Sequence, residues 1–133
     1  MKIYFSGSIR GGRQDAELYA QLIDFLKSFG TVLTEHIGYA SIDDSKTDRE
    51  IHDEDVQWLT DSDIVIAEVT TPSLGVGYEI GRAVEMKKRI LCLYRTSNGK
   101  NVSAMINGSP HLSCFEYKNI DEAKRIISKF ISE

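Results

Sequence analysis

Residues 64–87 read IVIAEVTTPSLGVGYEIGRAVEMK and contain an apolar run, a glycine-containing junction and a periodic segment in succession. The run at 64–67 predicts a buried strand, and the spacing at 80–87 predicts a helix. Three glycines around this strand-to-helix junction let the backbone approach a ligand and leave the first N–H groups of the helix free for an anion. The junction therefore suggests chemistry on a phosphorylated small molecule.

Glu79 is the single carboxylate of this junction, about one turn into the predicted helix. A carboxylate beside an anion cradle suggests catalysis. Acidic residues are also common in the first turn of helices, because they complement the helix dipole. The residues alone leave both roles of Glu79 open.

Strands and helices alternate outward from this junction. Strands are predicted at 3–5, 31–34, 63–68, 89–94 and 115–117, and further helices at 14–29, from the capping box of Thr47 and Glu50 through residue 59, and from the cap Asn119 to 132. A polar loop is expected at 36–46, a turn at 97–100 and a short apolar turn at 102–106. The alternation predicts an α/β protein, a single-domain Rossmann-like or flavodoxin-like three-layer sandwich over residues 1–133 with a five-stranded, largely parallel sheet.

Composition narrows the class of protein. A chain of 133 residues is long enough for one domain and too short for two. The net charge of −4 argues against a general nucleic-acid binder. No apolar run approaches the roughly 20 residues of a membrane span, and residues 1–5 enter a strand rather than a signal peptide. Cys92 and Cys114 lack the spacing of metal ligands and fit a reduced, cytoplasmic protein.

A second glycine-rich segment, GSIRGGR at residues 7–13, follows the first strand. In open parallel sheets the first and third strand–helix junctions commonly meet at the ligand site, and here both contain glycine. Arg10 or Arg13 can hold a phosphate through two parallel hydrogen bonds. The segment is neither a dinucleotide fingerprint nor a P-loop. Phosphate binding and a merely flexible turn both remain open.

Other polar residues give weaker signals. The acidic cluster 53–55 is typical of a solvated helix face. Glu68 ends a strand, where a capping or surface role is as good an interpretation as catalysis. Ser73 is a candidate N-cap for a helix that begins near Leu74. The three histidines have no metal-ligand spacing, and the absence of G-x-S-x-G argues against a serine hydrolase.

Seven segments share one register with a known family over nearly the whole chain: residues 4–13, 32–36, 51–59, 67–70, 72–83, 89–93 and 102–106. Together they resemble the 2′-deoxynucleoside 5′-monophosphate N-hydrolases, a branch of the nucleoside 2-deoxyribosyltransferase superfamily. Members cleave the N-glycosidic bond of deoxynucleotides and release the base and 2-deoxyribose 5-phosphate. The resemblance implies this hydrolase activity without a cofactor or metal.

The resemblance also implies roles for individual residues. Glu79, in the G-Y-E motif, corresponds to the nucleophile that forms a glycosyl-enzyme; Asp55 corresponds to the residue that transfers a proton at the leaving base, and Tyr4 lies beside the sugar. The implied substrate-binding residues are Gly7, Ser8, Ile9, Arg10, Gly11, Gly12, Arg13, Ser73, Gly75, Ser103, Ala104 and Met105. The segment containing Ser103 would come from the second subunit of a homodimer.

Two other functions remain. A nucleoside deoxyribosyltransferase moves the sugar of unphosphorylated nucleosides to another base, and a nucleotide-binding module would bind without turnover. Ser8, Arg10 and Ser73, together with Ser103, favour the hydrolase because hydroxyl and cationic groups suit a phosphate. The expected partners are a deoxynucleoside monophosphate and a second copy of the chain, with no nucleic acid and no membrane. The preferred base is not predicted.

Overall fold

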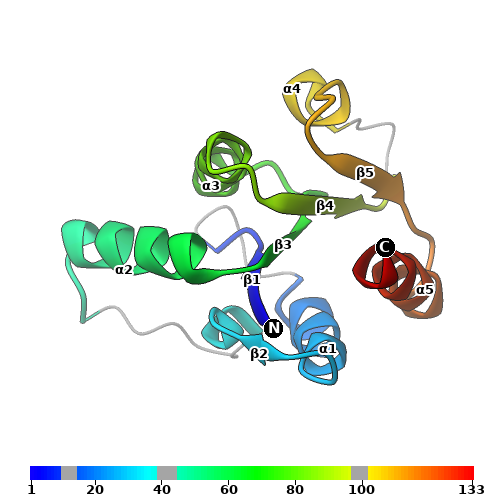
Figure 1. The fold of residues 1–133 in the computed structure, drawn as a ribbon, viewed down its shortest axis with the longest axis horizontal. Coiled ribbons are helices and arrows are strands. Elements are labelled where there is room, and N and C mark those ends of the chain that lie inside the picture. Colours follow the sequence, from blue (N-terminus) through cyan, green and yellow to red (C-terminus); the bar gives the residue numbers. More distant parts are fainter. Residues whose placement is uncertain (10–14, 39–44, 97–101) are drawn as a thin grey trace.

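The computed structural model describes residues 1–9, 15–38, 45–96 and 102–133. Its five strands form one parallel sheet in the order β2-β1-β3-β4-β5 (Figure 1). The strands are β1 Lys2–Ser6, β2 Thr31–Val32, β3 Ile64–Glu68, β4 Arg89–Tyr94 and β5 Ser113–Glu116. This is the flavodoxin-like order, in which the strands stay parallel and the order in which they are added changes side between β1 and β3. The predicted α/β architecture is confirmed.

Helices cover both faces of the sheet. They are α1 Ala16–Leu26, η1 Glu35–Gly38, α2 Asp48–Asp61, α3 Leu74–Glu85, α4 Ala104–Asn107 and α5 Ile120–Ser132. Figure 1 shows α1 and α5 on one side of the sheet and α2 and α3 on the other. Each side has its own apolar core, so the molecule has three layers.

Alternate residues of the central strands face opposite layers. Phe5 and Ile66 lie in the core that packs against α1 and α5. Tyr4 and Val65 lie in the core beneath α2 and α3. Tyr4 is therefore aimed at the layer that contains Glu79.

Two boundaries differ from the sequence prediction for physical reasons. The helix predicted at 14–29 spans Ala16–Leu26, and a turn follows it to Gly30. β2 ends at Val32, because the Thr34 hydroxyl accepts a hydrogen bond from the Phe5 N–H at 2.8 Å and donates to the Phe5 carbonyl at 2.6 Å. That side chain replaces the next step of the backbone ladder, and η1 follows, beginning one residue before the predicted loop.

Other predicted elements hold with small shifts. The capping box of Thr47 and Glu50 is confirmed, and α2 runs two residues beyond the predicted end. Asn119 caps α5 through its side chain, as predicted. The apolar turn at 102–106 forms the short helix α4, and β5 begins two residues earlier than predicted. The predicted turn at 97–100 lies outside the described residues.

Within the described ranges, no helix has both the length and the apolar character that crossing a bilayer requires. Cys92 and Cys114 are neighbours in register on β4 and β5, and both thiols are free. Burial raises the pKa of the Cys92 thiol to about 12, so it is protonated at neutral pH.

Candidate active site

The side chains of Tyr4 and Glu79 meet between the sheet and α3. Tyr4 is fully buried on the central strand β1, and its hydroxyl donates a hydrogen bond to the Glu79 carboxylate. Burial raises the pKa of Tyr4 well above its ordinary range, and the negative charge of Glu79 raises it further. The phenol therefore stays protonated and acts as a fixed donor to the carboxylate.

The carboxyl group of Glu79 has a pKa raised into the neutral range. Burial raises its pKa to about 7, and the charge of Asp55 adds to that rise. The hydrogen bond from Tyr4 and the nearby hydroxyl of Ser6 act in the opposite direction. Close to neutral pH this group is thus ready to stabilise or trap a cationic carbon.

Asp55 lies on α2 and is half-buried, and its negative charge acts on both Glu79 and Tyr4. Burial raises its pKa to about 6, with a further contribution from Glu54, while Lys46 and His52 lower it. Its charge in turn raises the pKa of both Glu79 and Tyr4, so the three groups form one electrostatic unit. A carboxyl group with a pKa in this range can donate or accept a proton at neutral pH.

The three acidic residues at 53–55 have different surroundings on α2. Asp53 is exposed and pairs with Arg49 at 3.4 Å and with His52 at 2.9 Å. Glu54 forms an ion pair with Lys46 at 2.5 Å. The prediction of a solvated face holds for these two residues and is wrong for Asp55, which is half-buried.

The start of α3 is open to a ligand. Ser73 is its N-cap, as predicted, and its side chain accepts a hydrogen bond from the Val76 N–H at 3.3 Å. The N–H groups of Leu74 and Gly75 belong to the first turn, which has no intrahelical acceptor for them. A Cβ added at Gly75 would meet only the Ser73 hydroxyl, at 3.8 Å. This exposed helix start is suited to binding an anion.

The first glycine-rich segment begins in a tightly packed position. A Cβ added at Gly7 would lie 2.9 Å from the ring of Tyr19, so glycine allows this close approach. The Ser8 N–H donates to the Tyr19 hydroxyl at 3.1 Å. The Ser8 hydroxyl is buried without a hydrogen-bond partner in the described part of the chain. An unpaired buried hydroxyl is costly, and a bound ligand would satisfy it.

Arg10, Gly11, Gly12 and Arg13 lie outside the described residues, and Ile9 is half-buried against the core beneath α1.

The segment containing Ser103 lies at the exposed start of α4. Ser103 is the N-cap of α4 and accepts from the Met105 N–H at 3.2 Å. Ser103 and Ala104 are exposed, and Met105 is 83% exposed. α4 leads into β5, the edge strand on the far side of β3 and β4 from β1 (Figure 1).

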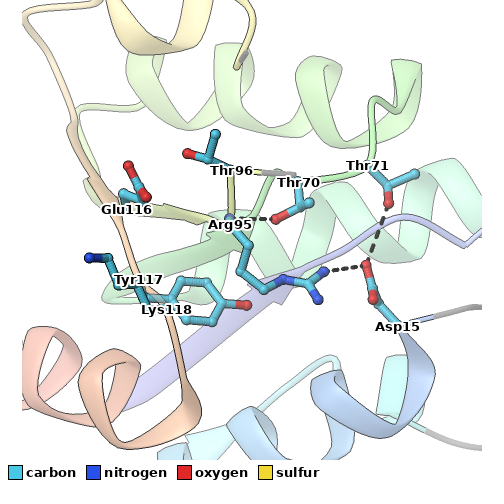
Figure 2. A pocket seen from close by; sticks show the side chains of 8 residues that line it. All are labelled: Asp15, Thr70, Thr71, Arg95, Thr96, Glu116, Tyr117 and Lys118. Carbon is cyan, nitrogen blue, oxygen red and sulfur yellow. Dashed lines mark hydrogen bonds and ion pairs between the residues drawn. The ribbon is translucent and has the colours of Figure 1, made fainter. Parts of the chain in front are cut away.

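A cavity of about 490 Å³ lies at the carboxyl ends of β3, β4 and β5 (Figure 2). Its lining residues are Asp15, Thr70, Thr71, Arg95, Thr96, Glu116, Tyr117 and Lys118, and include neither Glu79 nor Asp55.

Beside this cavity lies Glu68, which is fully buried and accepts hydrogen bonds from Thr70 and Tyr117. The surface role considered for Glu68 is therefore wrong. In the sequence, Arg95 directly follows the strand predicted at 89–94, just as Glu68 ends the strand predicted at 63–68. A cation at this end of the neighbouring strand was the available indication that Glu68 has a charged partner.

The residues of known placement do not form a metal centre. Across residues 1–9, 15–38, 45–96 and 102–133, no three His, Cys, Asp or Glu side chains come together as a ligand set. His52 instead contacts Asp53 and the Tyr78 hydroxyl, each at 2.9 Å. His36 packs against the ring of Trp58, with 5.4 Å between ring centroids.

Residues 3–111 match the family model described as nucleoside 2-deoxyribosyltransferase. The chain belongs to this family. Its relatives include a 5-hydroxymethyl-dUMP N-hydrolase of Tetraodon nigroviridis, which is 53% identical over 99% of this chain and 98% of the relative. The human 5-hydroxymethyl-dUMP N-hydrolase is 50% identical, over 92% of this chain and 73% of the relative. A putative 2′-deoxynucleoside 5′-phosphate N-hydrolase 1 of Nematostella vectensis is 52% identical, over 98% and 95%.

The family fold extends to more distant proteins. The chain matches the solved structure of a Clostridium botulinum CMP N-glycosidase, BcmB, with a TM-score of 0.73 and 19% identity. The match covers 98% of this chain and 99% of that protein. At this identity the match supports the shared fold.

Proposed function

We propose that this protein hydrolyses the N-glycosidic bond of 2′-deoxynucleoside 5′-monophosphates, giving the free base and 2-deoxyribose 5-phosphate. The observation that carries the proposal is the Tyr4–Glu79 pair, with Asp55 beside it and the open start of α3 on the same helix as Glu79. Relatives about half identical to this chain are named as N-hydrolases of such nucleotides, which supports the same substrate class here.

The first step breaks the bond between C1′ and the base nitrogen. Asp55, in its protonated form, gives its proton to the departing base. The ionised Glu79 stabilises the oxocarbenium-like transition state and forms a bond to C1′, yielding a glycosyl-enzyme. Tyr4 holds the carboxylate in position with its hydrogen bond.

The second step releases the sugar. Asp55, now ionised, accepts a proton from a water molecule as the water oxygen bonds to C1′. The bond between C1′ and Glu79 breaks, and both carboxyl groups return to their starting forms. The cycle starts from the singly protonated pair with the proton on Asp55. Because the pKa of Glu79 is about 7 and that of Asp55 is about 6, the proton of the free pair lies mainly on Glu79 near pH 6.5, and the reactive form is the less populated of the two.

The phosphate of the substrate is assigned to the two glycine-containing junctions. The Ser8 hydroxyl, which has no partner among the residues that the structure describes, the Ser73 hydroxyl and the first-turn N–H groups of α3 supply hydrogen-bond donors. Gly7, Ile9 and residues 10–13 complete the first junction, where Arg10 and Arg13 would add positive charge. Gly75 lets the phosphate approach the helix start.

The active unit is proposed to be a homodimer in which Ser103, Ala104 and Met105 reach the partner's phosphate site. Leu74 is 97% exposed and Met105 is 83% exposed, an unusual exposure for apolar side chains of this size. Gly77 and Gly81 add an open strip along the outer surface of α3. A two-fold contact between copies would cover these groups.

Two other functions are separated by one experiment. The purified protein is incubated with a panel of deoxynucleoside monophosphates, including 5-hydroxymethyl-dUMP, and with the matching nucleosides, with and without a second free base. The proposal predicts release of base from the monophosphates. Exchange of bases on the nucleosides would indicate a transferase, and tight binding without turnover would indicate a sensing module.

A further inference from the structure

Glu68 lies on the face of the sheet opposite to Glu79. It ends β3, in the alternation that places Ile64 and Ile66 against α1 and α5. Its carboxylate accepts hydrogen bonds from the Thr70 N–H at 2.7 Å, from the Thr70 hydroxyl at 3.1 Å and from the Tyr117 hydroxyl. A fully buried carboxylate thus fixes the first residues of the turn that leads to Ser73.

Arg95 and Asp15 extend these contacts to α1. The Nε of Arg95 lies 3.5 Å from Glu68, and its terminal nitrogen donates to Asp15 at 2.7 Å. Asp15 also lies 3.5 Å from the Thr71 hydroxyl, and the Arg95 N–H donates to the Thr70 hydroxyl at 2.9 Å. Figure 2 shows Arg95 extended between Thr70 and Asp15. The turn at 70–71 is held to both β4 and the start of α1.

Tyr19 connects the same cluster to the first glycine-rich segment. Burial raises its pKa to about 12, and the negative charges of Glu68 and Asp15 raise it as well. That hydroxyl accepts the Ser8 N–H, and the ring packs beneath Gly7. Both junctions assigned to the phosphate therefore adjoin one charged cluster, in which Glu68 is fully buried and the Arg95 side chain is 33% exposed.

We propose that Glu68, Arg95 and Asp15 are positioning residues that set the spacing between the two phosphate-binding junctions. The proposal rests on the function proposed above. Burying charged groups costs free energy, and such groups are useful when they select a single geometry. Because Tyr4, Glu79 and Asp55 lie on the other side of the sheet, loss of the cluster should weaken phosphate binding more than the bond-breaking step.

The test compares Asp15→Asn, Glu68→Gln and Arg95→Met with the control Arg89→Met. Arg89 begins the strand that Arg95 follows, and its guanidinium contacts the Phe130 carbonyl and ring far from the cluster. Each protein is assayed for kcat and KM with a deoxynucleoside monophosphate, for competitive inhibition by 2-deoxyribose 5-phosphate, and for Tm.

The cluster variants should raise KM and the inhibition constant about tenfold, as expected for one charge-assisted hydrogen bond, with kcat within about threefold of wild type. Asp15→Asn combined with Arg95→Met should add little to either single change, because both act through one ion pair. Arg89→Met should lower Tm and leave KM unchanged.

Two results would overturn the proposal: an unchanged KM in the folded cluster variants, or an equal rise in KM in Arg89→Met. If Glu68→Gln fails to fold, Asp15→Asn carries the same test, since its side chain is at the cavity edge and 13% exposed. Wild-type protein without turnover would contradict the proposed function. Turnover with an unchanged KM in Asp15→Asn would contradict the positioning role alone.

Discussion

Replacing Glu79 by glutamine should stabilise the protein at alkaline pH while removing its turnover. Burial raises the pKa of Glu79 from an ordinary 4.5 to about 7. Between these values the folded protein holds a proton that the unfolded chain has released, so the free energy of unfolding falls as the pH rises. At 1.36 kcal/mol per pH unit the full effect is about 3 kcal/mol, of which about 2.5 kcal/mol falls between pH 5 and pH 8.5.

Urea denaturation at pH 5 and pH 8.5 measures this effect directly. The free energy of unfolding of Glu79→Gln, relative to wild type, should rise by about 2.5 kcal/mol from the lower to the higher pH. Glu85→Gln is the matched control, because it makes the same change at an exposed position of α3. A relative stability of Glu79→Gln that is equal at the two pH values would refute the burial argument.

Four further predictions concern activity. The profile of kcat/KM against pH should be bell-shaped, with apparent pKa values near 6 and 7 for its two limbs, because activity needs one proton on the pair of Asp55 and Glu79. A flat profile would contradict the role of this pair. Asp55→Asn should lower kcat about 10²- to 10⁴-fold and remove the alkaline limb, which single-turnover assays can check. Mixing Glu79→Ala chains with chains bearing a bulky residue at Ser103 should restore activity through one intact site per mixed dimer; no recovery after subunit exchange argues against shared sites. A ribonucleotide should react more slowly than its deoxy counterpart, because a 2′-hydroxyl crowds Tyr4 and slows departure of the base; equal rates would exclude this explanation.

The fold was largely predictable because local signals agree with the tertiary structure. The apolar runs, the capping box at Thr47 and the cap at Asn119 each mark an element that the structure contains. The length of β2 was not predictable from its composition. It depends on the Thr34 side chain meeting Phe5 on a strand 29 residues away, and such a contact has no local pattern.

Some residues of the candidate site could likewise be predicted from local sequence, and others could not. Ser73 is recognisable as an N-cap from its position. The junction around Glu79 left its role open, and its catalytic role was predicted from the family resemblance. Asp55 has the sequence surroundings of a surface residue, and the folded structure half-buries it, which local sequence does not show. Glu68 was misjudged for a related reason, since its partners Arg95 and Tyr117 come from strands and turns far along the chain.

Identification of the residue that bonds to the sugar tests the proposed mechanism most directly. A 2′-fluoro deoxynucleoside monophosphate slows the cationic steps, so the intermediate can be quenched, digested and analysed by mass spectrometry. The account predicts a fluorinated sugar phosphate on the peptide that contains Glu79, and no adduct in Glu79→Gln. An adduct on Asp55 instead, or wild-type base release by the folded Glu79→Gln protein, would contradict it.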